Sequence, residues 1–589
     1  MTGQVLPTSS FTRTVLPLTT AAAWRDSLGV PQVGSIEATG LTAGGVTDNR
    51  ATLQAQWDAA ATAGKALSIT VPGTYSLTAT GSGANRWCLK PASASTRYGL
   101  ILGPGVILQL AASQASDGNP VSMIRVADHT GGGFIGWPYG GRGGSLVGNT
   151  ANQSGWTTAS GEGGTRYGQS NGNHGISGTD TSGQGSRNWT IQGLSVTDWF
   201  SNPINWGSVN NYDLGSRNIH VDNCYFSDVG EGCQFIGVQN CSMTRIEDVG
   251  QANKRVGDYC ELAFCTNFFV DHIYAHTNGA TVTTGGAAVD AYASRRGTIS
   301  NVLAYKTAQG VTLQTDFGNS SNVSTDVTVT NLVCRDVYNQ SIIPAEGGSS
   351  TFSNILIDNS SLGVSYSIDC SGFATTAQFS LSNCLVTNSY GAGLSKGRHD
   401  WSNVNFVGGS NTTSVSAITV GGANSPSLNF NGVKAASYSY GLYMETATPA
   451  GRWSGVDLSG NSSGPKAIAS GTLADVSIPD GVVGDSFAPY YLGVTGVPDT
   501  LPWQGYRQFY GITNSPIKNI AAGHKNQILT IVFLYAGGTL QDYRAGGTSG
   551  GNLRLAGGAD KAFSTGDSVT LRWDATQLNQ WVEVCRSVN

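Results

Sequence analysis

Val329-Thr-Asn-Leu-Val-Cys334 is one copy of a pattern that recurs along the middle of the chain. In each copy an apolar residue and one polar residue precede an Asn, and apolar residues then alternate with other residues. The copies follow one another about every 26 residues from Asn223 to Gly455. The other strong copies are Val221-Asp-Asn-Cys-Tyr-Phe226, Ile299-Ser-Asn-Val-Leu-Ala304, Phe352-Ser-Asn-Ile-Leu-Ile357, Leu381-Ser-Asn-Cys-Leu-Val386 and Trp401-Ser-Asn-Val-Asn-Phe406. Weaker copies carry Gly193, Arg245, His272, Asn431 and Gly455 at the Asn position.

This period predicts an all-β fold, a right-handed parallel β-helix. β-branched residues alternate within each copy, Gly, Asn and Ser separate the copies, and no helical stretch intervenes. A propeller blade would need about 40 residues, and a leucine-rich repeat would show Leu-x-x-Leu spacing. We interpret the Asn position as structural, because stacked amides hydrogen-bond to one another along a β coil.

The ends of the chain differ from the repeat and predict three regions. A short helix over residues 21–28 belongs to an N-terminal linker, residues 1–34. Residues 35–480 form the β-helix, and a second helix over residues 49–64 turns Leu53 and Trp57 inward to cap its first coil. After residue 480 the repeat stops, and strands at hairpin-like intervals predict a C-terminal β-sandwich, residues 481–589.

Composition excludes several functions. The net charge is −5 and only 12% of the 589 residues are charged, so no basic surface for nucleic acid is expected. No window approaches the roughly 20 apolar residues that span a bilayer, and the first residues lack the layout of a secretory signal. We therefore expect a soluble chain without membrane insertion or Sec export. The ten cysteines show no metal-ligand spacing, so we expect buried thiols made in a reducing cytoplasm, with no metal and no cofactor.

Both ends resemble a known family. Gly45-Val-Thr-Asp-Asn49, the helix after it and Val71-Pro-Gly-Thr-Tyr75 resemble the opening of the pectate-lyase-like β-helix of phage tailspikes and polysaccharide depolymerases. Residues 14–29 resemble the linker of such spikes, and Gly566–Trp573 with Trp581–Arg586 resemble a C-terminal module of phage tail fibres and spikes. The resemblance implies a homotrimer that binds and cleaves a bacterial surface polysaccharide (capsule, exopolysaccharide or O-antigen). It implies that residues 1–34 attach to the virion, that residues 35–480 are catalytic and that residues 481–589 serve trimerisation or glycan binding. It implies a place in the virion tail, with synthesis in the host cytoplasm and action at the host surface. Only about 30 residues precede the β-helix. From the resemblance we expect the chain either to dock through its N-terminus to the phage tail or to another tail protein, or to be truncated.

Carboxylates on the coil are the candidate catalytic groups. Glycan hydrolysis needs one protonated and one ionised carboxyl on an accessible surface. Aligning the second strands of successive coils places Gln234, Glu261, Asp290 and Gln314 in one outward column, because their neighbours Cys260, Leu262, Val289 and Ala291 are apolar. Adjacent coils lie about 4.8 Å apart. Neighbouring carboxylates suit a retaining glycosidase, and a pair two coils apart suits an inverting one.

A second, shorter column holds Glu231 and Asp258. Glu231 on one coil and Asp258-x-x-Glu261 on the next resemble the acidic cluster of podovirus tailspike endorhamnosidases. That resemblance implies that Glu231, Asp258 and Glu261 are catalytic, and Asp290 joins them by its place in the first column. Residues three apart face opposite sides of a straight strand, so Asp258 and Glu261 converge only if the chain bends between them. The alternative is that these acids solvate the coil or pair with Lys254, Arg255, Arg295 and Arg296.

Two further classes of function stay open. A polysaccharide lyase needs a base and a cation, for which nearby candidates are Lys254, Arg255, His272, Tyr274, His276 and Arg295. A non-catalytic receptor-binding spike would use the acids only as hydrogen-bonding groups. The residues expected to contact the substrate are Trp199, Trp206, Gln234, Tyr259, Tyr292, Arg295 and Gln314.

Overall fold

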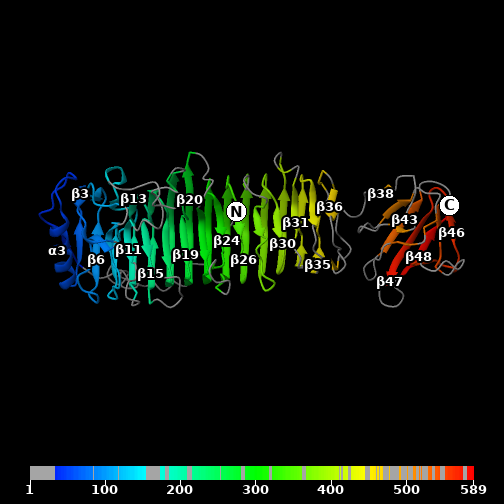
Figure 1. Ribbon diagram of the computed structural model, residues 1–589, viewed down its shortest axis with the longest axis horizontal. Helices are drawn as coiled ribbons and strands as arrows, with labels where there is room; N and C mark the ends of the chain where they lie inside the picture. Colours follow the sequence, from blue (N-terminus) through cyan, green and yellow to red (C-terminus); the bar gives the residue numbers. More distant parts are fainter. Residues whose placement is uncertain are drawn as a thin grey trace, which may run out of the picture. The chain divides into compact units, whose positions relative to one another are not determined.

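Parallel strands dominate the computed structural model of the chain (Figure 1). The chain divides into two compact units, Met1–Ala345 (unit 1) and Glu346–Asn589 (unit 2). The expected helix over residues 21–28 and the expected boundary near residue 480 lie outside the described residues. The structure describes residues 34–588 apart from 84, 117–118, 154–172, 179–184, 208–214, 252–253, 280–285, 317–321, 361–365, 410–411, 413–414, 422–425, 445–450, 459, 463, 469–475, 478–489, 492–499, 502–507, 512–515, 518, 521–527, 534–537, 544–550 and 575–579.

Unit 1 consists of successive coils whose strands form two ladders, which are parallel apart from one antiparallel pair at the start of the second ladder. The strands of the first ladder, which we call the long-strand sheet, are β1 (Ser35–Glu37), β2 (Ala66–Ile69), β3 (Gly73–Leu77), β6 (Tyr98–Leu102), β7 (Val106–Leu110), β9 (Gly133–Gly136), β10 (Ser145–Val147), β12 (Arg187–Gln192), β13 (Ser195–Trp199), β15 (Arg217–Asp222), β16 (Tyr225–Val229), β18 (Gln239–Gln251), β20 (Thr266–Asn278), β22 (Arg295–Tyr305) and β24 (Thr325–Arg335). The strands of the second ladder, the short-strand sheet, are β4 (Thr80–Ser82), β5 (Asn85–Leu89), β8 (Val121–Arg125), β11 (His174–Gly178), β14 (Ile204–Trp206), β17 (Cys233–Ile236), β19 (Cys260–Ala263), β21 (Ala287–Tyr292), β23 (Gln309–Thr312) and β25 (Ile342–Ile343). A 3-10 turn, η1, spans Thr150–Asn152.

Unit 2 contains the same two kinds of strand, followed by the C-terminal module. Its long-strand sheet holds β26 (Ser349–Asp358), β28 (Gln378–Thr387), β30 (Arg398–Val407), β32 (Ser427–Asn431), β33 (Lys434–Ala436), β35 (Gly451–Ser454) and β37 (Val476–Ser477). Its short-strand sheet holds β27 (Ile368–Cys370), β29 (Ala392–Leu394), β31 (Ser416–Val420), β34 (Tyr440–Met444) and β36 (Gly464–Ile468). Alternate residues are buried in long strands such as β20, and short strands such as β14 are buried at every residue. Apolar side chains fill the coil interior. The predicted parallel β-helix is confirmed.

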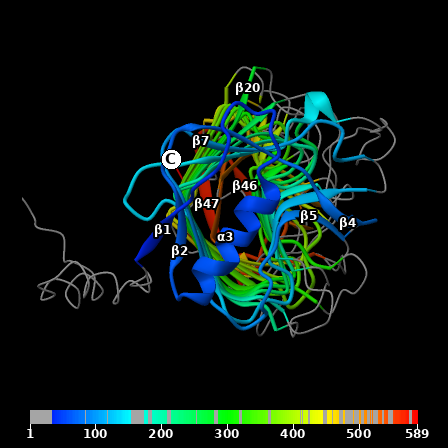
Figure 2. The same cartoon turned by 90° about the vertical axis from the view of Figure 1, so that its left-hand side faces the viewer.

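One helix caps the first coil, as the sequence predicts. The helix α3 (Arg50–Thr62) buries Leu53, Trp57, Ala60 and Ala61 and contacts β2 and β6. Figure 2 shows α3 lying across the end of the blue coils. Among the described residues, no helix has the length and apolarity needed to cross a membrane.

The Asn position of the repeat is a left-handed corner. Asn223, Asn301 and Asn331 have φ of 52°, 53° and 55°, a conformation that Asn tolerates better than most residues. The amides also stack: Asn331 Nδ2 donates a hydrogen bond of 3.0 Å to Asn301 Oδ1. The structural role is therefore confirmed. The prediction is wrong at Asn431, because Gly432 (φ 67°) makes that corner.

A second amide ladder was not apparent from the repeat. Asn188, Asn218, Asn240 and Asn267 also have positive φ, between 54° and 60°. Their amides hydrogen-bond from coil to coil at 2.8, 3.4 and 3.1 Å. On these four coils, the long-strand sheet therefore begins at one left-handed corner and bends at another.

The C-terminal module of unit 2 has two main sheets over one buried apolar cluster, which includes Ile531, Leu571 and Trp581. Strands that the sequence predicts over residues 527–535, 552–556, 568–573 and 580–585 appear as β43, β45, β47 and β48. The module's strands are β38 (Tyr490–Tyr491), β39 (Thr500–Leu501), β40 (Gln508–Gly511), β41 (Pro516–Ile517), β42 (Asn519–Ile520), β43 (Ile528–Phe533), β44 (Gly538–Leu540), β45 (Leu553–Arg554), β46 (Lys561–Phe563), β47 (Ser568–Asp574) and β48 (Gln580–Ser587). All ten cysteines of the chain are free, and nine are buried.

Candidate active site

A column of polar side chains crosses the short-strand sheet of unit 1. The register aligns Asn205, Gln234, Glu261, Asp290 and Thr312 on β14, β17, β19, β21 and β23. Asn205 Nδ2 donates a hydrogen bond of 2.5 Å to Gln234 Oε1, and Gln234 Nε2 donates one of 2.5 Å to Glu261 Oε2. Glu261 and Asp290 are direct neighbours, so their Cα atoms are about 4.8 Å apart.

The register corrects one member of the predicted column. Thr312 lies beside Asp290, so the prediction of Gln314 at this position is wrong. A shift of two residues along a strand leaves the inward and outward alternation unchanged, and the sequence pattern therefore cannot detect it. The burial of the column also differs from expectation, because Gln234 and Thr312 have no exposed surface.

Asp290 is a buried carboxyl group beside two other acids. Its exposed fraction is 5%, and Thr312 Oγ1 donates a hydrogen bond of 2.6 Å to its Oδ1. Burial raises the pKa of Asp290 well above its usual value, and the carboxylates of Asp258 and Glu261 raise it further, while the Thr312 hydrogen bond acts in the opposite direction. Desolvation and like charge together favour the protonated form of Asp290.

Asp258 and Glu261 converge on Asp290 because the chain bends between them. It bends at Gly257 and at Tyr259 and enters β19 only at Cys260. Asp258 Oδ1 accepts a hydrogen bond of 2.6 Å from the backbone N–H of Ala287 on the next coil. An equivalent convergence occurs two coils earlier, where Asn205 Nδ2 lies 3.4 Å from Asn202 Oδ1.

Glu231 occupies the coil before Asp258 and is also buried, with 4% of its surface exposed. Asn202 Nδ2 donates a hydrogen bond of 3.3 Å to Glu231 Oε2. Gly257 leaves the space that Glu231 fills, since a Cβ at Gly257 would lie 2.3 Å from Glu231 Cγ. The structure thus gathers all four predicted acids on three successive coils.

Three polar residues of this cluster were missed by the sequence analysis: Asn202, Asn205 and Thr312. A signal for the first two was present. Asn202-x-x-Asn205 has the same spacing as Glu231-x-x-Gln234 and Asp258-x-x-Glu261, and the spacing recurs because each coil presents the same bend. The sequence around Thr312 does not show this spacing, so it gave no indication that Thr312 belongs to the cluster.

A buried ion pair supports the turn before Asp258. Arg255 and Asp248 hydrogen-bond with neither side chain exposed, and the Arg255 guanidinium lies 4.1 Å from the centroid of the Tyr259 ring. Tyr259 Oη is 2.6 Å from Thr277 Oγ1. Burial raises the pKa of Asp248 to about 7, although Arg255 acts to lower it.

This packing corrects the predicted substrate contacts. Trp199, Trp206 and Tyr259 have no exposed surface, so they are core residues and do not present rings to a glycan. Trp206 belongs to an interior aromatic row, with its ring centroid 6.3 Å from that of Trp189. Gln234 is also buried and contacts Glu261 rather than solvent.

Two predicted contact residues keep some exposed surface. Tyr292 lies on β21 with Asp290 and is half-buried, and its Oη donates a hydrogen bond of 2.7 Å to Asp316 Oδ1. Arg295 is half-buried at the start of β22, in register with Thr266. It therefore lies on the long-strand sheet and not in the acid column.

In the described part of the chain, Arg255 is the candidate lyase group for which a contact with one of the acids is seen: its Nη1 donates a hydrogen bond of 3.5 Å to the backbone oxygen of Asp258. Arg255 is paired with Asp248, and Lys254 Nζ lies 3.4 Å from Asp228 Oδ1. The rings of Tyr274 and His276 stack at 4.2 Å on β20 of the long-strand sheet. His272 lies on the same strand, where its Nδ1 is 2.6 Å from Asp271 Oδ2.

Comparisons with known proteins show similarity of fold but no close relationship in sequence. No protein-family model and no curated protein matches the chain. Pre-mature gene product 12 of bacteriophage phi29 is 12% identical, with a TM-score of 0.47, over 88% of this chain and 69% of that chain. A tailspike protein variant of E. coli bacteriophage HK620 is 11% identical, with a TM-score of 0.44, over 73% and 75%. The A-module of Azotobacter vinelandii mannuronan C-5 epimerase AlgE6 is 15% identical, with a TM-score of 0.41, over 77% and 100%. The structural neighbours thus include phage tailspikes and a polysaccharide-processing enzyme.

Proposed function

We propose that this chain is a tailspike depolymerase that cleaves a bacterial surface polysaccharide by endo-acting glycoside hydrolysis. The observation that carries the proposal is the pair of neighbouring carboxyl groups, Glu261 and Asp290, of which Asp290 has a pKa well above its usual value. Two carboxyl groups in different protonation states at neutral pH are what hydrolysis of a glycosidic bond requires.

The different environments of Asp290 and Glu261 indicate which of the two acts as the acid and which as the base or nucleophile. Asp290 is the general acid that protonates the leaving oxygen, since burial and two nearby carboxylates favour its protonated form. Glu261, which accepts a hydrogen bond from Gln234, is the ionised base or nucleophile. Asp258 and Glu231 supply the negative charge that surrounds the developing oxocarbenium ion.

Product analysis tests the reaction type. Purified full-length protein is incubated with surface polysaccharides from candidate hosts, and the released oligosaccharides are weighed. Products that carry one added water support hydrolysis. Products with an unsaturated sugar end, lighter by one water than hydrolysis products, contradict it and identify a lyase.

A second candidate is a non-catalytic receptor-binding spike. The low exposure of Glu231 and Asp290 favours it, because a buried acid network can also serve only to hold the coils together. Stable binding of the polysaccharide without release of any product would identify this function.

The proposal includes a homotrimer in the virion tail that attaches through its N-terminal segment. An exposed apolar pair supports contact between copies. Tyr274 and Leu303 are neighbours in register on β20 and β22, and each is 37% exposed. Light scattering should give three times the chain mass of 61.1 kDa, and the mass of one chain at micromolar concentration would contradict the trimer.

A further inference from the structure

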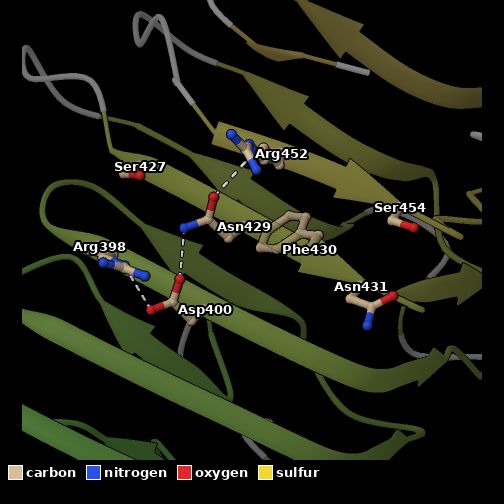
Figure 3. A pocket seen from close by; sticks show the side chains of 8 residues that line it. All are labelled: Arg398, Asp400, Ser427, Asn429, Phe430, Asn431, Arg452 and Ser454. Atoms are coloured by element: carbon tan, nitrogen blue, oxygen red, sulfur yellow. Dashed lines mark hydrogen bonds and ion pairs between the residues drawn. The ribbon is translucent and has the colours of Figure 1, made fainter. Parts of the chain in front are cut away.

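A hollow on the outer face of unit 2 lies outside the candidate active site. Its volume is about 530 Å³, and it extends over β30, β32 and β35 of the long-strand sheet. Figure 3 shows Arg398, Asp400, Asn429 and Arg452 in a row across these strands.

The row is held in place by its own hydrogen bonds. Arg398 Nε lies 2.7 Å from Asp400 Oδ2. Asn429 Nδ2 donates a hydrogen bond of 2.7 Å to Asp400 Oδ1, and Asn429 Oδ1 accepts one of 3.2 Å from the backbone N–H of Arg452. Both oxygens of Asp400 are therefore occupied from within the protein.

The floor of the hollow is closely packed from within the coil. Beneath the row, the ring of Phe430 stacks on Trp401 at 5.1 Å and on Trp453 at 5.3 Å. These rings are at most 2% exposed, so they form the interior of the coil and fix the backbone that carries the polar row. A ligand would meet a preformed surface, which lowers the entropic cost of binding.

The hollow continues as a groove. A second hollow of about 280 Å³ shares Asp400, Asn429 and Asn431 with the first and reaches β28. The two together cross four neighbouring strands, β28, β30, β32 and β35, which is about 14 Å at the spacing of strands in a sheet. An elongated, shallow groove of this kind fits a chain-like ligand better than a single small molecule.

The groove has cationic groups available for a ligand. Within the described part of the chain, the Arg452 guanidinium has no hydrogen-bond or ion-pair partner, and Arg398 uses only its Nε. Two guanidinium groups and one satisfied carboxylate leave a net positive charge in a protein whose overall charge is −5. Guanidinium groups bind carboxylates through paired hydrogen bonds.

We propose that this groove is a second glycan-binding site, separate from the acid column, for a carboxylate-bearing polysaccharide. Arg398 and Arg452 bind carboxylates along the chain, and Ser427 and Asn431 hydrogen-bond to sugar hydroxyls. The groove holds substrate and does not cleave it. The inference goes beyond the proposed hydrolysis, and it depends only on the groove.

The test measures binding of hexagalacturonic acid to the full-length protein by calorimetry, with the methyl-esterified hexamer as the neutral probe. We expect the acidic hexamer to bind at least tenfold more tightly than the ester, and more weakly as NaCl is raised from about 50 to 500 mM. Arg452→Gln and Arg398→Gln should each weaken binding about tenfold. Lys434→Gln, which removes a positive charge from β33 outside the hollow, is the matched control and should bind like the parent.

Ser427→Trp fills the hollow without changing its charge and should also abolish binding, and equal thermal midpoints would show that these variants are folded. Equal affinity for the acidic and esterified hexamers, or no binding of either, would overturn the proposal. So would a change of assembly mass in the arginine variants with unchanged binding, which would identify the groove as a contact between copies of the chain. None of these readouts depends on cleavage, so failure here is distinct from failure of the proposed hydrolysis.

Discussion

The side-chain amide of Gln234 connects Glu261 to a neutral residue, Asn205, through two hydrogen bonds of 2.5 Å. Gln234 is fully buried, so it cannot exchange these partners for water. Its amide orientation is fixed, since Asn205 donates to its oxygen and leaves its nitrogen to donate to Glu261. Gln234 is therefore a positioning residue for Glu261.

Gln234→Leu should lower kcat about 10- to 150-fold, because loss of a buried hydrogen bond to a charged group costs about 1.5–3 kcal/mol. The acidic limb of the pH–rate profile should move to higher pH, since the ionised carboxylate loses the donor that stabilises it. Initial rates on the polysaccharide between pH 4 and 8 give both results. Gln378→Leu, on β28 of unit 2, is the control. A lower rate with an unchanged profile would mean that Gln234 acts only through folding.

Replacing either carboxyl of the central pair should abolish most cleavage. We expect Asp290→Asn and Glu261→Gln each to reduce the rate about 10²- to 10⁴-fold, the usual contribution of a positioned acid or base. Retained binding of the polysaccharide shows that the fold persists. Asp326→Asn, at an exposed position of β24, should cleave like the parent. Unchanged cleavage in Asp290→Asn would remove Asp290 from the mechanism.

The raised pKa of Asp290 has a consequence for stability. Between the ordinary pKa of an aspartate, about 3.9, and the higher value in the folded protein, the folded chain holds a proton that the unfolded chain releases. The free energy of unfolding therefore falls as pH rises through this window. Asp290→Asn removes the effect of Asp290, so its thermal midpoint should fall less between pH 4 and 8 than that of the parent. The thermal midpoint of both proteins should still fall to some extent, because Asp248, whose raised pKa is about 7, has the same effect in both.

Removing one partner of the buried Arg255–Asp248 pair should strongly destabilise the protein. Arg255→Met leaves the Asp248 carboxyl buried without its partner, a change that typically costs about 3–5 kcal/mol. Thermal unfolding measures the loss, which should be greater at pH 8 than at pH 5, because Asp248 is neutral at the lower pH. The double variant Asp248→Leu/Arg255→Met should recover most of the loss. If it does not, the cost arises from the Tyr259 contact and not from the isolated charge.

Two variants of Asn331 can distinguish the contribution of its left-handed backbone conformation from that of its side-chain hydrogen bond. Asn331→Ala loses the hydrogen bond to Asn301 and keeps a Cβ at φ 55°. A left-handed conformation costs an ordinary residue about 1–2 kcal/mol, and alanine lacks the polar side chain that lets Asn tolerate it. Asn331→Gly loses the same hydrogen bond but tolerates the conformation. The alanine variant should therefore have the lower thermal midpoint. Equal midpoints would mean that amide stacking, and not backbone conformation, selects Asn.

Much of the coil could be predicted because its signals are local. The Asn corner, the alternation within each copy and the capping helix with Leu53 and Trp57 depend on neighbouring residues in the sequence. The candidate acids could also be found, since Glu231, Asp258, Glu261 and Asp290 recur at the spacing of the coils. The exposure of aromatic residues could not be predicted from the sequence, because Trp206 and Tyr259 have the same side-chain chemistry in a core as on a surface.

Stacked parallel coils, and four carboxyl groups on three successive coils, can be predicted from the amino-acid order alone. The folded chain was needed to establish that Thr312 and not Gln314 lies beside Asp290, that Gln234 faces Glu261, and that Arg255 pairs with Asp248. Alternation along a strand specifies the side of the sheet on which a residue lies, but it does not specify the register between coils. That register is set by loop length and by contacts between residues about 20 to 30 positions apart.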